Sequence, residues 1–159
     1  MKKILVTGSS GQLGSELRFL SINQKQFQWV FTDINELDLS NIETLENNIS
    51  KIFPSLIINC AAYTAVDKAE TENELANILN FKAIDIISKW SSTNNKKLIH
   101  ISTDYVFDGE SKTPLKEGAV TSPINVYGST KLAGERICLK NDLNSIIIRT
   151  SWVYSSFGN

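Results

Sequence analysis

Two residues on one predicted helix, Tyr127 and Lys131, are the first candidates for chemistry in this sequence. The segment 125–140 predicts a helix, and residues four apart on a helix share a face. A free tyrosine has a pKa of about 10, too high for ready proton exchange at neutral pH. A nearby lysine ammonium stabilises the phenolate and lowers that pKa, so we expect Lys131 to tune Tyr127 for proton transfer. The pattern is weak alone, because Tyr and Lys at this spacing are common on helices.

Thr103 is a third candidate, because it directly follows the apolar segment 97–102, a predicted strand. Its hydroxyl could hydrogen-bond a reacting oxygen and help to place it. Lys131 could also donate to a ribose hydroxyl of a cofactor. With the next two features, these three side chains point to redox chemistry with a dinucleotide.

A glycine loop follows the apolar run 4–6, with glycines at positions 8, 11 and 14. We expect Gly8 to allow a tight turn, Gly11 a close approach of backbone to a ligand, and Gly14 the packing of a helix against the sheet. A helix that begins near Gly11 would aim unpaired N–H groups at a phosphate or pyrophosphate. Ordinary turn chemistry is the alternative, since the spacing is one residue wider than the G-x-G-x-x-G fingerprint.

Asp33 ends the second aromatic and β-branched run, 27–32, and lies 19 residues beyond Gly14. An acid at this place can accept hydrogen bonds from both hydroxyls of an adenosine ribose. A helix cap or a turn is the alternative role. A carboxylate there would also repel a 2′-phosphate, which favours NAD mildly over NADP.

The elements that position these residues alternate along the chain. Strands are predicted at 4–6, 27–32, 56–59, 97–102 and 144–150; helices at 15–20, at 42–53 with Ser40 as N-cap and Pro54 as stop, at 66–91 and at 125–140; and an exposed loop at 108–122. Such alternation predicts an α/β fold, a Rossmann-type doubly wound, mostly parallel sheet with helices on both faces. At 159 residues the chain has the size of one domain.

Composition excludes several other classes of function. The formal net charge is −1 without a basic stripe, so we expect no nucleic-acid partner. Cys60 and Cys138 form no C-x-x-C pattern, so neither a metal site nor a disulfide is predicted. No apolar run reaches the length of a membrane span, and the expectation is a cytoplasmic protein without a membrane partner. His100, alone within a strand, is given no chemical role.

Five segments together resemble the extended short-chain dehydrogenase/reductases, and within them most closely the reductases that complete dTDP-L-rhamnose synthesis. They are 8–14, 59–70, 102–107, 125–135 and 149–154, and the strings Thr-Asp-Tyr-Val-Phe and Arg-Thr-Ser-Trp-Val-Tyr are specific. The resemblance implies NADPH- or NADH-dependent reduction of the C4 keto group of a nucleotide sugar. Related 4,6-dehydratases carry glutamate where this chain has Tyr105, which favours a simple reductase.

The resemblance also implies a role for each matching residue. Tyr127 would be the proton donor, Lys131 its tuner and a cofactor contact, and Thr103 the third catalytic member. The cofactor would be held at the pyrophosphate by Gly11, Gln12 and Leu13, at the adenosine ribose by Asp33, at the adenine by Asp38 and Leu39, and along the nicotinamide half by Ala62, Tyr63 and Thr64. The nucleotide sugar would contact Thr103, Asp104 and Trp152, although a core aromatic is the ordinary role for a tryptophan.

The family pattern continues beyond Asn159, so we expect residues 1–159 to be the NAD(P)-binding domain without the family's carboxyl-terminal substrate domain. Some relatives use magnesium at a dimer contact. Glu16 matches one of its ligand positions, but no metal site is predicted here. The resemblance allows a homodimer. Two alternatives stay open: a non-catalytic dinucleotide-binding regulatory subunit, and another sugar-nucleotide reductase or epimerase.

Overall fold

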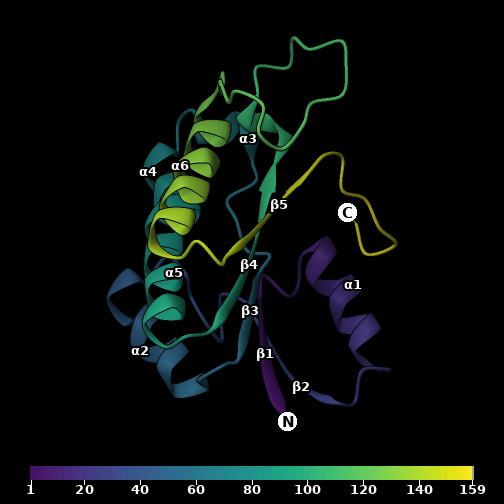
Figure 1. The fold of residues 1–159 in the computed structure, drawn as a ribbon, viewed down its shortest axis with the longest axis vertical. Coiled ribbons are helices and arrows are strands. Elements are labelled where there is room, and N and C mark those ends of the chain that lie inside the picture. Colours follow the sequence, from purple (N-terminus) through teal and green to yellow (C-terminus); the bar gives the residue numbers. More distant parts are fainter. Residues whose placement is uncertain (159) are drawn as a thin grey trace.

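The computed structural model describes residues 1–158, which form a five-stranded sheet with helices on both faces (Figure 1). All neighbouring strands are parallel, in the order β2-β1-β3-β4-β5. The strands are β1 (Lys2–Thr7), β2 (Phe27–Thr32), β3 (Leu56–Asn59), β4 (Lys97–Thr103) and β5 (Ile146–Thr150). The predicted fold class is confirmed. The strand order reverses between β1 and β3, where ligands bind in sheets of this type.

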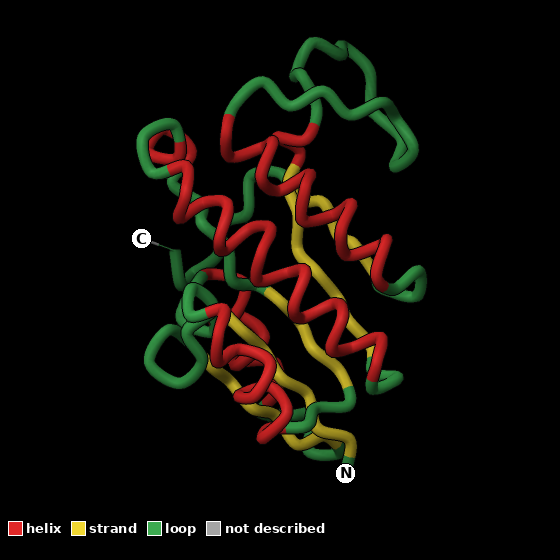
Figure 2. The backbone as a smooth tube through the Cα atoms, turned by 90° about the vertical axis from the view of Figure 1, so that its left-hand side faces the viewer, coloured by secondary structure: helices red, strands yellow, loops and turns green. Residues whose placement is uncertain are grey.

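The helices cover the two faces unequally (Figure 1). They are α1 (Gln12–Ser21), α2 (Ile42–Ile52), α3 (Val66–Ala69), α4 (Asn73–Asn77), the π-helical segment η1 (Ile78–Lys82), α5 (Ala83–Thr93), the 3-10 turn η2 (Asp104–Val106) and α6 (Val126–Asn141). Helix α1 lies on one side of the sheet, whereas α2, α5 and α6 lie on the other. Figure 2 shows this second group in front of the strands.

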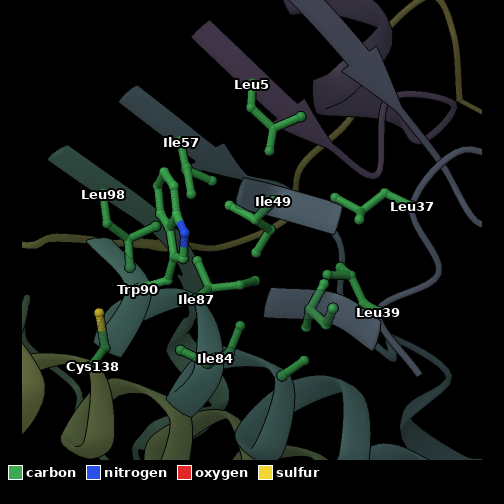
Figure 3. Close-up of a cluster of buried hydrophobic side chains, with 12 residues drawn as sticks. Leu5, Leu37, Leu39, Ile49, Ile57, Ile84, Ile87, Trp90, Leu98 and Cys138 are labelled. Atoms are coloured by element: carbon green, nitrogen blue, oxygen red, sulfur yellow. The ribbon is translucent and has the colours of Figure 1, made fainter. Parts of the chain in front are cut away.

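The core lies between the three central strands and this second helical layer (Figure 3). Leu5, Ile57 and Leu98 stand opposite one another in the registers of β1, β3 and β4, and each is at most 1% exposed. Ile87 and Trp90 of α5 pack against them. Strands covered by a helical layer need continuous apolar runs, which is why these segments were recognisable in the sequence.

The predicted helix 66–91 is wrong as a single element, because contacts from distant parts of the chain interrupt it. The Glu70 carboxylate accepts a hydrogen bond from the backbone N–H of Val126 (2.8 Å), where α3 gives way to a turn. Further on, η1 replaces regular helix around Asn80, whose side chain bonds both backbone groups of Tyr63. A Cβ at Gly134 of α6 would overlap the Asn80 carbonyl oxygen, so the two helices pack backbone to backbone there.

Three smaller predictions also differ from the structure. The N-cap of α2 is Asn41, whose side chain accepts from the Thr44 N–H, while the Ser40 hydroxyl donates to Asp38 instead (2.6 Å). Helix α1 begins at Gln12 with Gly11 as its N-cap, so the expected helix start near Gly11 is confirmed and the bound at residue 15 is wrong. The last strand begins at Ile146, after a turn in which Ser145 N–H bonds the Asp142 carbonyl.

Candidate active site

A cavity of about 670 Å³ lies at the carboxyl edge of the sheet. Every strand supplies residues to it at or just beyond its end: Gly8 after β1, Asp33 after β2, Cys60 after β3, Thr103 at the end of β4 and Thr150 at the end of β5. Its size is typical of small-molecule and cofactor sites. Parallel strands bring these chain segments together because their carboxyl ends share one edge.

The cavity collects all but one of the residues predicted for the site. It is lined by Gly8, Gly11, Gln12, Leu13, Gly14, Asp33, Asp38, Leu39, Ala62, Thr64, Thr103, Asp104, Tyr127, Lys131 and Trp152. The exception is Tyr63, whose hydroxyl donates to Glu72 (2.7 Å) and whose backbone is bonded by Asn80. The side chain of Tyr63 packs in a cluster with Ala69, Ala76 and Tyr127 and does not line the cavity.

The glycine loop is folded tightly enough to explain two of its glycines. Gly8 has φ +64°, and a Cβ there would lie 2.6 Å from the Ala61 backbone nitrogen. At Gly14 a Cβ would overlap the Gly8 carbonyl oxygen and Ser9. Gly14 therefore lets the helix pack against its own loop and not, as predicted, against the sheet, since the loop doubles back over the first turn of α1.

The start of α1 presents free donors to the cavity. Gly11 is the N-cap and supplies no side chain, and the N–H of Ser15 makes the first helical bond, to the Gly11 carbonyl (2.9 Å). The N–H groups of Gln12, Leu13 and Gly14 precede this bond, so no helical carbonyl accepts from them. These donors and the positive end of the helix dipole suit a phosphate or pyrophosphate.

Asp33 joins the end of β2 to the glycine loop. One carboxylate oxygen accepts from the Ser10 N–H (2.8 Å) and the other from the Ile34 N–H (2.9 Å). Partial burial raises the pKa of Asp33, but these backbone donors outweigh it and hold the pKa below its ordinary value. The side chain is thus a carboxylate at neutral pH, with a structural role in the loop in addition to its place on the cavity wall.

The catalytic candidates lie where α6 meets the end of β4. Tyr127 packs edge-on against Tyr105, with ring centroids 5.5 Å apart. A Cβ at Gly128 would overlap the Tyr105 carbonyl oxygen, so this glycine lets α6 approach η2 closely. The Thr103 hydroxyl donates to an Asp104 carboxylate oxygen (3.1 Å). The tyrosine, threonine and aspartate thereby share one region of the cavity wall.

Two hydrogen bonds hold the first turn of α6, which carries Tyr127. The Asn125 side chain caps the helix by accepting from the Gly128 N–H (2.7 Å), and Glu70 accepts from the Val126 N–H. Side chains that accept from these first N–H groups stabilise a helix start. The position of Tyr127 is therefore set from two sides, by its own cap and by the segment after β3.

Lys131 is 2% exposed, and its ammonium donates to the Ile101 carbonyl oxygen (2.6 Å). Burial lowers the pKa of Lys131 to about 8, although Glu135 and Cys60 act in the opposite direction. The ammonium remains the main form at pH 7. Its one bond to the protein leaves N–H donors free, since an ammonium has three.

The expected lowering of the Tyr127 pKa is not what the structure shows. Burial raises the pKa of Tyr127 above its ordinary value, the side chain of Thr103 opposes this in part, and Asp104 and Tyr105 add to the rise. Lys131 is not among the groups that shift it. The Tyr127 hydroxyl therefore stays protonated at neutral pH, the state a proton donor requires.

Trp152 lies on the cavity wall after β5 and is 91% exposed, with φ +51°. A core position for this ring is thereby excluded. Sequence reasoning missed part of the wall. Tyr105 lines the cavity, and its place in the string Thr-Asp-Tyr-Val-Phe was the signal that could have indicated this. Leu75 and Leu79 line it too, but in the sequence they are only part of an apolar helix face.

Neither metal binding nor membrane spanning is indicated by the described residues. Within 1–158, no group of three or more His, Cys, Asp or Glu side chains is arranged to hold a metal ion. Across the same residues, every helix is too short or too polar to cross a membrane.

The whole chain, residues 1–159, matches the family model described as the RmlD substrate binding domain. The dTDP-4-dehydrorhamnose reductase of Aggregatibacter actinomycetemcomitans is 38% identical over 159 residues, which are 100% of this chain and 54% of the relative. The enzyme of that name from Escherichia coli K12 is 43% identical, over 98% of this chain and 53% of its own length. The chain thus spans about half the length of the curated relatives it matches.

Solved structures give the same result. The dTDP-4-dehydrorhamnose reductase of Bacillus anthracis, in complex with NADP, superposes with a TM-score of 0.93 at 38% identity and covers 100% of this chain and 57% of that one. The Clostridium acetobutylicum protein of the same name also gives 0.93, at 38% identity, over 99% of this chain and 55% of that one. The fold, the cavity and the match of the family model to residues 1–159 agree, and the chain belongs to the RmlD substrate-binding domain family.

Proposed function

We propose that residues 1–159 are the cofactor-binding and catalytic portion of a nucleotide-sugar reductase. The reaction is the NADPH- or NADH-dependent reduction of the C4 keto group of dTDP-4-dehydro-L-rhamnose to dTDP-L-rhamnose. The names of the relatives support the substrate, and the NADP complex of the Bacillus anthracis relative supports the cofactor class. The carboxyl-terminal half of such relatives would supply the remaining contacts to the sugar nucleotide.

One observation carries the proposal: a single cavity joins the free N–H groups at the start of α1 to Tyr127 and Lys131 on α6. A dinucleotide needs an anion site for its pyrophosphate and, at some distance, a protonated acid beside its reactive ring. Gly11 is open on the cavity side, because a Cβ there would meet only the Gly8 carbonyl oxygen, at 3.4 Å. The residues present thus fit a dinucleotide.

Three side chains of this chain have defined roles in the proposed reaction. The nicotinamide cofactor, when bound, supplies the hydride that goes to C4 of the keto sugar. Tyr127 donates its phenolic proton to the oxygen at C4 as negative charge develops there. Thr103 hydrogen-bonds the same oxygen and orients it. Lys131 holds a positive charge at the cavity wall and would donate to a ribose hydroxyl of the cofactor.

Asp33 is the proposed contact to the adenosine ribose, with Asp38 and Leu39 beside the adenine. The Asp33 carboxylate is already used by two backbone donors, and each oxygen retains a lone pair for a hydroxyl. Because it is negative at neutral pH, we expect NADH to bind at least as well as NADPH. Trp152 and Asp104 are the proposed contacts to the nucleotide sugar.

Titration of the chain with NADH and with NADPH, followed by nicotinamide fluorescence, tests the cofactor assignment. We expect saturable binding that Gly14→Ala abolishes and Gly118→Ala leaves unchanged, because a Cβ overlaps the loop at Gly14 and meets nothing within 4 Å at Gly118. Absence of binding by the folded wild-type chain to either cofactor would overturn the assignment.

Turnover separates a reductase from a regulatory subunit that merely binds the cofactor. The assay uses dTDP-4-dehydrorhamnose as substrate and a form of the chain extended by the carboxyl-terminal half that the relatives have. In it, Tyr127→Phe should remove activity and retain cofactor binding, because only the hydroxyl is lost. Equal turnover by wild type and Tyr127→Phe would refute the role of Tyr127. Cofactor binding without any turnover by the wild type of that extended form would support the regulatory alternative.

A further inference from the structure

Three polar side chains form a row across the sheet just beneath the cavity. Thr7, Asn59 and His100 stand opposite one another in the registers of β1, β3 and β4, and none is more than 2% exposed. Burying polar groups in an apolar sheet is unfavourable unless hydrogen bonds compensate. We call these residues the polar row.

Hydrogen bonds within the polar row determine which nitrogen of His100 carries the proton. The Ala61 carbonyl can only accept, so it orients the Asn59 amide with Nδ2 toward it, and Oδ1 accepts from the Thr7 hydroxyl (2.6 Å). Asn59 Nδ2 then donates to the Ala61 carbonyl (3.3 Å) and to His100 Nδ1 (2.9 Å). An amide nitrogen is only a donor, so Nδ1 accepts and Nε2 bears the hydrogen.

Two polar groups on the same side of β4 are left over. His100 Nε2 and Ser102 Oγ are both buried, and neither has a hydrogen-bond partner among the described protein atoms. They lie two residues apart on one strand, so their side chains leave the same face of the sheet. Leu98, on this face too, packs in one cluster with Cys138 of α6, which identifies the face as the one that α6 covers.

The side chain of α6 that reaches this region is Lys131. Its ammonium donates to the Ile101 carbonyl, which lies between His100 and Ser102 in the chain. Burial lowers the pKa of His100 well below its ordinary value, and the positive charge of Lys131 lowers it further. The imidazole is therefore neutral, and it lies near enough to the ammonium to be affected by its charge. Donors remain free on Lys131 and His100, and Ser102 can accept.

We propose that His100 is a positioning residue for Lys131, acting through one buried water that His100 Nε2–H, the Lys131 ammonium and the Ser102 hydroxyl share. The water oxygen accepts from the imidazole and the ammonium, and a water hydrogen is donated to Ser102 Oγ. Three polar partners are what a buried water usually has. The bridge restrains the Lys131 ammonium at the cavity floor. Its use in binding a cofactor rests on the proposed function, whereas the bridge itself does not.

Nuclear magnetic resonance of the unliganded chain tests the bridge directly. The sequence contains one histidine, so ¹⁵N-histidine labelling gives a single imidazole. We expect the neutral Nε2–H form throughout the range in which the chain is folded near neutral pH, and magnetisation transfer from a long-lived water to that hydrogen. The Nδ1–H form, or an Nε2–H without contact to water, would overturn the proposal.

Two substitutions separate positioning from ordinary core stability. His100→Gln puts an amide donor near the position of Nε2, whereas His100→Asn keeps an acceptor for Asn59 and removes the Nε2 donor. We expect NADH affinity in His100→Gln within about twofold of wild type and a loss of about tenfold in His100→Asn, since a buried group left without its partner costs on this order. Equal affinities in two variants that both fold would refute the positioning role.

The two proposals fail in distinguishable ways. If neither the wild type nor the variants bind NADH, the proposed function fails, but the imidazole spectrum of the wild type still tests whether the water bridge exists. If His100→Asn does not fold, as circular dichroism would show, the tautomer and the water contact of the wild-type imidazole decide it alone.

Discussion

Replacing Lys131 by methionine should stabilise the folded chain at neutral pH while impairing its site. Burial holds the pKa of Lys131 at about 8, against an ordinary value of 10.5. This difference corresponds to a penalty of about 3 kcal/mol for keeping the ammonium in the folded state at pH 7. Loss of the bond to the Ile101 carbonyl costs about 1 kcal/mol. The free energy of unfolding of Lys131→Met should therefore exceed that of wild type by about 2 kcal/mol.

The sign of the pH dependence follows from the same values. Because the folded-state pKa of Lys131 is lowered, the unfolded chain binds more protons than the folded chain between pH 8 and 10.5. Wild-type stability therefore gains from this residue as pH rises through that window, and Lys131→Met lacks this gain. The advantage of the variant should be complete below pH 8 and should disappear as pH approaches 10.5.

Urea denaturation of both proteins at pH 7 and again near pH 10, followed by circular dichroism, measures the effect. Lys112→Met is the matched control, since Lys112 is exposed in the segment between η2 and α6 and its loss should change little at either pH. A variant less stable than wild type at pH 7, or an advantage equal at both pH values, would refute the reasoning. NADH affinity measured on the same samples should fall, which would show that Lys131 is kept for binding at the expense of stability.

Three further outcomes are expected. Tyr127→Phe should lower turnover by about 10²-fold or more, as loss of a general acid does, with little change in NADH affinity measured by fluorescence titration. Gly14→Ala should lower the midpoint of thermal unfolding by several degrees in a calorimetric scan, because its Cβ overlaps the loop, whereas Gly118→Ala should not. Asp33→Asn should reduce both NADH affinity and stability. Because the Asp33 pKa is lowered, its contribution is present above pH 3.8 and is lost as pH falls below that value, so urea midpoints of the two proteins should converge in acid.

Sequence patterns predicted a feature of the candidate site correctly when that feature depends on residues close together in the chain. Gly8 was predicted as the tight turn because left-handed backbone is easy for glycine, and its φ is +64°. Tyr127 and Lys131 were expected on one side of a helix, and both line the cavity. Gly14 was assigned the wrong neighbour, since the doubling back of the loop is a property of its fold and not of its spacing. Tyr63 was expected along the nicotinamide half of the cofactor, but its hydroxyl bonds Glu72 and it does not line the cavity.

The amino-acid sequence by itself determined the alternation of strands and helices, the edge of the sheet at which the cavity lies, and most of the predicted residues that line it. The alternation and the edge follow from apolar periodicity and from glycine positions, which act within a few residues, whereas several of the lining residues were implied by the family resemblance. Only the tertiary structure decided the break in the helix 66–91, the raised pKa of Tyr127, the lowered pKa of Lys131 and the pairing of His100 with Asn59. Each of these depends on burial or on partners remote in sequence, such as Val126 for Glu70. Desolvation and such remote contacts exist only once the chain has packed.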